Sequence, residues 1–266
     1  MMKHGFSLGL AIALATPLPL SAAAISYDVA GSLYSQDFNH VTAPAGNANS
    51  TTAWTNGETI TGWHGTLDAA RSTTVLVSNG VNSAISGGIG TLTSMGPASS
   101  NDRALGMQPG GGLTQYVAAQ FANGTGGTLS QFTLGYTGEQ WRRIDEATLT
   151  LVFEYRVFDS GTGSLNAAGP WTTVNALDFT GPSTGASGSR NGNDAANRTV
   201  ISPVDVPVTW NAGQELWIRW TGTSTGATAN RQMLGVDDLT FTAVPEPSAL
   251  LLGMVCVPWL SLRRRR

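Results

Sequence analysis

Alternation of apolar and polar residues with a period of two is the feature that most limits the fold of this chain. In the segment 147–158 one face of the repeat is apolar, and it consists of Leu149, Leu151, Phe153, Tyr155 and Val157. Successive side chains of a β-strand point to opposite faces, so this pattern is typical of a half-buried strand. Strands are also expected in five further segments: 73–77, 113–121, 132–136, 214–221 and 236–243.

The composition favours the same fold class. Charged residues make up only 12% of the chain, whereas helices of globular proteins usually carry many Glu, Lys and Arg residues. Asn123-Gly124 and Asn211-Ala212-Gly213 suit tight reversals between strands, and the polar segment 181–197 predicts a surface loop. We therefore expect an all-β domain over 25–243, a two-sheet antiparallel sandwich. It is jelly-roll-like if successive strands alternate between the sheets.

The N-terminal segment 1–24 has the layout of a secretory signal peptide. Lys3 supplies the positive charge, Phe6 to Ala15 is apolar or small, and the segment ends in small residues at Ala24. We expect a signal helix that signal peptidase removes near Ala24. The alternative is a buried first helix of the domain.

The C-terminal segment 244–266 predicts a membrane-associated tail. Val244-Pro245-Glu246-Pro247 is followed by an apolar stretch over 249–262 and then by four arginines. The stretch has 14 residues, fewer than the ~17–25 that usually span a bilayer, although snorkelling arginines extend its reach. We expect a short hydrophobic helix with its basic end in the cytoplasm and the domain outside.

Pro245, Glu246 and Pro247, the short hydrophobic segment and the basic end together resemble the PEP-CTERM sorting signal. This resemblance implies an exported protein that passes through an inner-membrane intermediate to the cell surface or extracellular matrix. It also implies processing by an exosortase-type enzyme in a bacterium that makes extracellular polysaccharide. The alternative is an ordinary C-terminal anchor with a proline-containing linker.

The domain itself is similar to uncharacterised bacterial β-sandwich domains that accompany PEP-CTERM tails. The landmarks are Tyr34 to Phe38, Gly62-Trp63, Asn101 to Gly106, Gly138 to Arg142 and Val236 to Leu239. The last of them also resembles the closing strand of many carbohydrate-binding jelly rolls. The similarity implies a fold and no particular activity.

The charge distribution argues against a nucleic-acid partner. Between Ile25 and Ala243 the chain has nine basic residues, all of them arginine, against sixteen acidic ones. Binding to nucleic acid depends mainly on cationic contacts with phosphate, which this domain is poorly equipped to make. The single cysteine, Cys256, lies in the tail, so the domain forms no disulfide.

Asp237 and Asp238 form one candidate site. Adjacent residues of a strand point to opposite faces, so the two carboxylates cannot easily act as a pair. One of them could bind Ca²⁺ together with backbone carbonyls, because hard oxygen ligands suit this ion. The alternative is a pair of carboxylates that accept hydrogen bonds from loop N–H groups.

Tryptophans beside charged residues form a second candidate site. Trp141 follows Glu139, and Trp217 lies between Glu215 and Arg219 on the polar face of its predicted strand. An exposed indole could stack against a sugar and donate a hydrogen bond to it, so Trp141, Trp217 and Arg219 are candidate glycan-binding residues. The alternative is packing, with the long arginine stems covering the rings.

Residues suited to catalysis are scarce. The domain contains two histidines, His40 and His64, no lysine and no Gly-x-Ser-x-Gly motif, so common nucleophilic arrangements have few building blocks. A pair of carboxylates for glycoside hydrolysis remains open. We expect no enzyme and no cofactor beyond the calcium ion considered above. The favoured function is a structural or adhesive surface protein. A carbohydrate-binding module is the alternative, with extracellular polysaccharide as the partner, and a glycan hydrolase ranks third.

Overall fold

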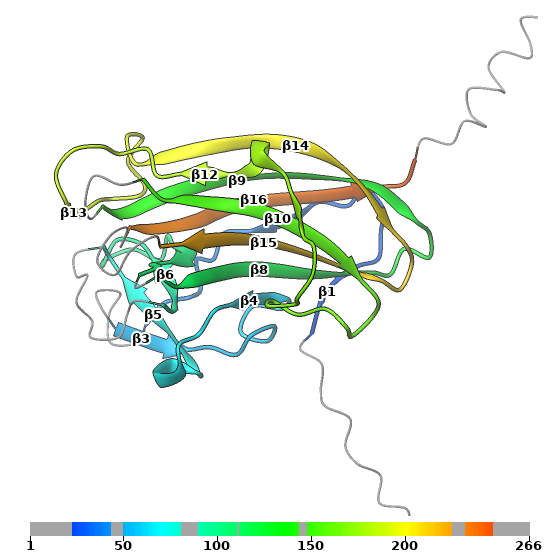
Figure 1. Cartoon of the computed structure of the whole chain (residues 1–266), viewed down its shortest axis with the longest axis horizontal. Coiled ribbons are helices and arrows are strands. Elements are labelled where there is room, and N and C mark those ends of the chain that lie inside the picture. The colour runs from blue at the N-terminus through cyan, green and yellow to red at the C-terminus, as the bar shows by residue number, and fades with distance from the viewer. Residues whose placement is uncertain are drawn as a thin grey trace, which may run out of the picture.

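A computed structural model describes residues 23–43, 50–80, 90–110, 112–143, 148–224 and 232–246 (Figure 1). Within these ranges the regular structure consists of β-strands and two short 3₁₀ turns, Ala69–Arg71 and Asn175–Leu177. The all-β fold is therefore confirmed. The expected signal peptide over 1–24 and tail over 244–266 lie outside the described residues, except for Ala23 and Ala24 at one border and 244–246 at the other. Across the described ranges, no helix combines the length and apolarity needed to cross a membrane.

The first sheet has seven strands, and β8 and β15 lie at its centre. Its main path is β1 (Ile25–Tyr27), β8 (Thr114–Asn123), β15 (Glu215–Thr223), β10 (Thr150–Phe158) and β11 (Thr172–Thr173). Off this path, β4 (Trp63–Gly65) pairs with β8 and β12 (Phe179–Thr180) pairs with β10.

The second sheet has nine strands and is built around the long strand β9. Its main path is β13 (Gly188–Ser189), β9 (Leu129–Arg143), β16 (Met233–Val244), β7 (Ala104–Met107), β6 (Leu92–Met95), β5 (Thr74–Ser78) and β3 (Ser50–Ala53). Off this path, β14 (Arg198–Trp210) pairs with β9 and β2 (Tyr34–Gln36) pairs with β16.

The long strands alternate between the two sheets, as a jelly-roll arrangement requires. Strands β8, β10 and β15 belong to the first sheet, whereas β9, β14 and β16 belong to the second. The predicted reversals at Asn123-Gly124 and at 211–213 therefore join strands of opposite sheets. Asn123 links these two corners, because its side-chain Nδ2 donates to the carbonyl of Trp210 at 2.8 Å and its backbone carbonyl accepts from the Gly213 N–H.

The sheets are mixed, and this corrects the expectation of a purely antiparallel sandwich. Strand β1 is parallel to β8, and β5 is parallel to β6. A parallel pair needs a long connection rather than a tight hairpin. Both pairs meet this condition, because β1 joins a strand about ninety residues later in the chain and β5 is separated from β6 by 79–91.

Aromatic side chains fill the space between the sheets. The rings of Phe121 and Phe241 stack with centroids 4.2 Å apart, and Trp63 and Trp220 stack at 6.3 Å. The predicted inward faces of β10 and β15 lie in this core, with Leu149, Leu151, Phe153, Leu216, Ile218 and Trp220 all buried. Burial of this much apolar surface stabilises the domain without a disulfide.

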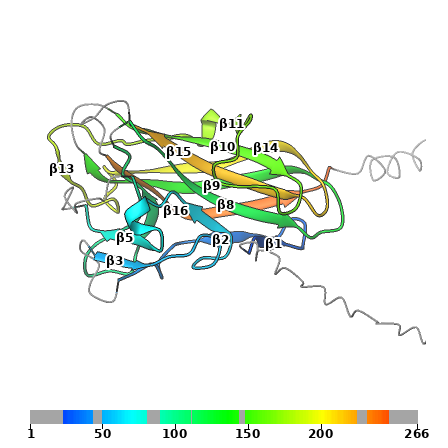
Figure 2. The ribbon, with the colours of Figure 1, turned by 60° about the horizontal axis from the view of Figure 1, so that its bottom comes forward.

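The beginning of β1 and the end of β16 lie at the same end of the sandwich (Figures 1 and 2). The Tyr27 hydroxyl accepts from the Ala243 N–H at 2.7 Å and lies 3.2 Å from the Ala243 carbonyl oxygen. The Gly31 N–H donates to the same carbonyl at 2.7 Å. The last residues of the domain are thus fixed to its first strand, and the tail leaves from a defined point.

Candidate functional site

A bulge in β14 distorts the edge of the second sheet near the point where the tail leaves. Pro207 pairs with Gln131 and Trp210 pairs with Leu129. Between these two pairs β14 advances by three residues and β9 by two, so β14 contains one extra residue. Proline lacks an N–H group and is tolerated at edges and bulges. Bulges of this kind redirect side chains and are frequent beside functional sites. Here Val208 and Thr209 are the residues between the two paired positions.

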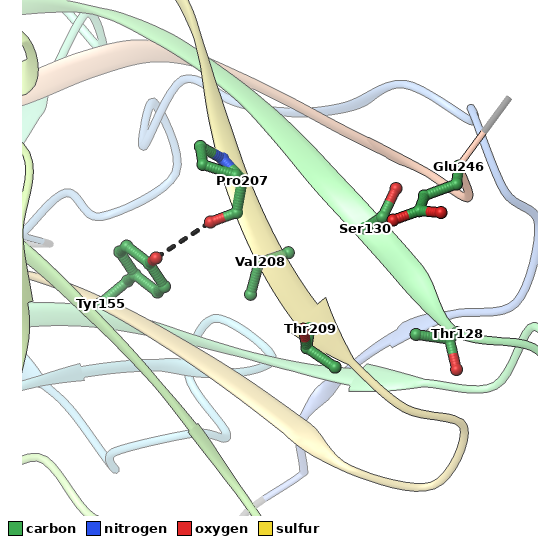
Figure 3. Close-up of a pocket in the computed structure, with 7 residues that line it drawn as sticks. All are labelled: Thr128, Ser130, Tyr155, Pro207, Val208, Thr209 and Glu246. Atoms are coloured by element: carbon green, nitrogen blue, oxygen red, sulfur yellow. Dashed lines mark hydrogen bonds between the residues drawn. The ribbon is translucent and has the colours of Figure 1, made fainter.

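The bulge borders a surface pocket of about 640 Å³ (Figure 3). The lining residues are Thr128, Ser130, Tyr155, Pro207, Val208, Thr209 and Glu246. The Tyr155 hydroxyl donates to the Pro207 carbonyl at 3.0 Å, which fixes the ring at one wall. The pocket therefore combines aliphatic hydroxyls, one aromatic ring and one carboxylate.

Glu246 reaches this pocket because β16 ends beside it. Val244 is the last residue of β16 and pairs with Gln131, the same residue that pairs with Pro207 on the other side of β9. Glu246 follows two residues later, and its carboxylate points toward Ser130 (Figure 3). The predicted sorting residues Pro245 and Glu246 thus adjoin the folded domain directly, while Pro247 lies outside the described residues.

Asp237 and Asp238 lie at a second irregularity, where the register of β16 against β9 shifts between Asp237 and Thr240. Asp237 is 3% exposed, and its Oδ1 accepts from the Asp238 N–H at 2.8 Å. Asp238 is exposed and adopts a left-handed conformation with φ of 47°. Burial, followed by the charge of Glu139, raises the pKa of Asp237 to about 9.

The geometry at Asp237 favours the structural alternative for this carboxylate. Its Oδ1 accepts a hydrogen bond from a backbone N–H group, as a capping role requires. Asp238 instead borders a surface pocket of about 340 Å³ with Asp37, Ser35 and Gln36. In the part of the chain that the structure describes, no three His, Cys, Asp or Glu side chains gather closely enough to hold a metal ion. Calcium binding at Asp237 or Asp238 stays a prediction.

Trp141 lies on the outer face of the second sheet, beneath the segment that carries β13. The ring is 1% exposed, and its Nε1 donates to Glu139 Oε2 at 2.8 Å. A side chain at Gly192 would collide with this indole, with a β-carbon only 2.3 Å from Nε1. Burial raises the pKa of Glu139 to about 7, although the bond from Trp141 opposes the shift. The ring therefore presents no open face to a sugar in this structure.

Trp217 and Arg219 lie on the outer face of the first sheet, and the segment 159–171 covers them. Trp217 is 3% exposed and donates from Nε1 to Glu215 Oε2 at 3.1 Å. The Arg219 guanidinium lies 3.7 Å from the ring centroid of Trp171 and 4.5 Å from that of Tyr116. This arrangement favours the packing alternative for both predicted glycan-binding residues.

His64 occupies the same covered face. Its ring lies 4.6 Å from that of Trp217, and its Nε2 is 3.2 Å from Gln120 Oε1. Burial lowers the pKa of His64 to about 4, so the ring is neutral at pH 7. The residue is held by an amide rather than by a nucleophile and a carboxylate, which is the geometry of a structural histidine.

Apart from Glu246, the residues that line the pocket at the β14 bulge were not among the candidates from the sequence. Tyr155 was expected in the core, and Thr128, Ser130 and Thr209 carried no distinguishing pattern. The available indication was the pair Pro203 and Pro207 within an otherwise strand-like segment. Prolines at such positions point to an edge strand with bulges, and the structure has both.

Comparisons with known proteins give neither a family nor a curated relative: no family model matches the chain, and no curated protein matches it. Several solved structures are similar. The CBM22-1 xylan-binding domain from Paenibacillus barcinonensis Xyn10C has 11% identity and a TM-score of 0.38, over 82% of this chain and 98% of that domain. TmCBM61, solved with β-1,4-galactotriose, has 9% identity and a TM-score of 0.31, over 71% of this chain and 94% of that one.

An adhesin domain is also among the similar structures. The K1 cleaved adhesin domain of Lys-gingipain from Porphyromonas gingivalis W83 has 16% identity and a TM-score of 0.26. The match covers 80% of this chain and 99% of that domain. Identities and scores this low carry no functional conclusion for the present chain.

Proposed function

We propose that this chain is an exported, non-catalytic surface protein whose sandwich binds polysaccharide in the pocket at the β14 bulge. The observation that supports this function best is the lining of that pocket. Thr128, Ser130 and Thr209 offer hydroxyl groups, Tyr155 offers a ring, and Glu246 offers a carboxylate. The hydroxyl groups and the carboxylate can hydrogen-bond to sugar hydroxyls, and the ring can pack against the C–H face of a sugar.

The size and chemistry of the pocket suit one or a few sugar units. Its volume of about 640 Å³ lies within the ~300–1,000 Å³ that is usual for small-molecule sites. Hydroxyl groups both donate and accept hydrogen bonds, as sugar hydroxyls do. An aromatic ring can pack against the C–H face of a pyranose. The ligand class that fits is therefore a polysaccharide without a high negative charge, because Glu246 would repel an anionic one.

Binding rather than cleavage is the activity we propose for this pocket. Glycoside hydrolysis usually needs two carboxyl groups on either side of the scissile bond. Among the described residues that line the pocket, Glu246 alone carries a carboxylate. A hydrolase remains the weaker alternative, and calcium at Asp237 or Asp238 remains an independent proposal.

The proposed route to the surface rests on the two ends of the sequence. Signal peptidase would remove the leader near Ala24, and an exosortase-type enzyme would recognise Pro245, Glu246 and Pro247. Before that step the tail would hold the protein in the inner membrane. The proline pair keeps this segment extended and outside any helix, which suits recognition by a protease.

Filling the pocket should weaken glycan binding. Thr209 is exposed, so Thr209→Trp should block the pocket without disturbing the core. The affinity for polysaccharide, measured by retardation of the purified chain in affinity gels, should fall at least ~tenfold. Thr173→Trp introduces the same side chain at an exposed position of the other sheet and should bind as the natural chain does. A natural chain that no polysaccharide retards, including that of the producing cells, would contradict the glycan proposal.

Replacing Glu246 should impair sorting. In Glu246→Ala the central carboxylate of the predicted motif is absent, so the precursor should accumulate in the membrane fraction of the producing cells. Immunoblotting for the full-length and processed forms measures the effect. Normal processing of Glu246→Ala would show that the tail is not recognised through this residue.

A further inference from the structure

The sorting motif and the proposed glycan pocket share one residue. Glu246 is the centre of Pro245-Glu246-Pro247, and it also lines the pocket at the β14 bulge. Only Pro245 separates it from the last residue of β16. An extended chain advances at most ~3.6 Å per residue, so Glu246 cannot move far from the sandwich while β16 stays paired.

The end of β16 is firmly held. Val244 pairs with Gln131 and Ala243 pairs with Phe132 on β9. On its other side, Ala243 hydrogen-bonds to Tyr27 and Gly31. Releasing Glu246 by peeling back the strand would therefore break contacts to both β1 and β9. An enzyme that recognises the motif must instead approach Glu246 where it lies.

At that position the carboxylate is part of the pocket wall. It points toward Ser130, and Thr128 lies on the same side of the pocket, while Tyr155 lies on the far side (Figure 3). A molecule that fills the space between these walls contacts Glu246 and covers it. An enzyme that binds the sorting motif would need the same surface of Glu246.

We propose that an occupant of this pocket and the enzyme that recognises the sorting motif compete for Glu246, so that a chain holding glycan in the pocket keeps its tail. The inference rests on the proposed function of the tail. Competition of this kind is reciprocal in binding free energy, since each of the two ligands weakens the binding of the other by the same factor. Processing would then favour chains that have not yet captured glycan.

A tryptophan introduced into the pocket serves as a permanent occupant and needs no identified ligand. We would express the full chain in the producing cells as Ser130→Trp and as Thr128→Trp, and follow processing by pulse–chase immunoblotting. Thr173→Trp is the matched control for a new surface indole. Each pocket variant should be processed about fivefold more slowly than the control, or slower still. Two variants are used because Ser130 is partly buried, whereas Thr128 is exposed.

The outcomes separate this inference from the proposed function. Slow processing of both folded pocket variants, with normal processing of Thr173→Trp, supports competition for Glu246. Normal processing of a folded pocket variant, together with impaired processing of Glu246→Ala, overturns the competition and leaves the sorting proposal in place. Normal processing of Glu246→Ala refutes the proposed role of the tail and this inference with it. Thermal melting of the purified variants establishes that they are folded.

Discussion

The free energy of unfolding should fall as the pH rises from about 4 toward 9, and Asp237→Asn should remove most of this fall. At pH 8 the variant should be more stable than the natural chain by an amount on the order of 3 kcal/mol. Near pH 4 the two proteins should have similar stability. Urea unfolding, followed by tryptophan fluorescence at several pH values, measures the difference.

The sign follows from the direction of the pKa shift. Burial, with the charge of Glu139 as the next cause, raises the pKa of Asp237 to about 9 from an ordinary value of 3.8. The folded state therefore binds the proton more tightly than the unfolded state does. The stabilisation is fully present below the unfolded pKa and is lost as the pH rises through the folded one. Glu139, whose pKa rises to about 7, contributes in the same direction.

Other charged groups near Asp237 and Glu139 also shift the pKa values of these two residues. Asp102 and Asp238 also raise the pKa of Asp237, whereas Arg198 lowers that of Glu139. Asparagine at 237 keeps an oxygen that can accept from the Asp238 N–H, so the variant removes the charge and retains the hydrogen bond.

Asp238→Asn is a matched control, because position 238 is exposed and asparagine tolerates its left-handed backbone. This control should change stability by less than ~0.5 kcal/mol. An Asp237→Asn protein whose stability follows the pH as steeply as that of the natural chain would refute the prediction. Protection of the natural chain by millimolar Ca²⁺ at pH 8 would instead indicate a cation near the pair.

Strands whose sequence alternates apolar and polar residues could be predicted, whereas short strands without that alternation could not. The alternation in β10 and β15 marks them clearly. Strands β6 and β7 are buried at every position, and their short sequences contain no period of two. Strand β14 was missed for another reason, because Pro203 and Pro207 interrupt it at an edge where only one neighbour is needed.

At the candidate sites, the alternation of residues along a strand did not predict which side chains are exposed. The polar face of β15 was interpreted as facing solvent, which made Trp217 a sugar platform. The structure places the segment 159–171 over that face, and the coverage depends on contacts from residues more than forty positions away, such as Gly163 against the indole. Likewise, strict alternation at Asp237 and Asp238 fails because the β16 register shifts there. The period-two pattern within one strand indicates neither that a distant segment covers the strand nor that its register shifts.

Arg219→Met should be the most destabilising single change on this covered face, at about 3 kcal/mol. The guanidinium bonds to Glu154 Oε2 at 2.8 Å and to the Leu165 carbonyl at 2.8 Å. Both side chains of the ion pair are largely buried, at 9% and 17% exposure. Methionine preserves much of the stem packing but leaves the Glu154 carboxylate without its cation, and an unpaired buried charge is costly.

A double-mutant cycle separates the ion pair from the packing. Glu154→Gln in the Arg219→Met background should restore at least ~1 kcal/mol of stability, because the amide carries no charge and can still accept from the Thr221 hydroxyl.

Arg156→Met is the matched control. This arginine also lies over a ring, 4.5 Å from the centroid of Phe158, but donates to the Ala168 carbonyl rather than to an acid. It should cost less than ~1 kcal/mol. If the double variant were no more stable than Arg219→Met, the arginine would act through stacking between Tyr116 and Trp171. The segment 159–171 would then be held by these rings rather than by charge.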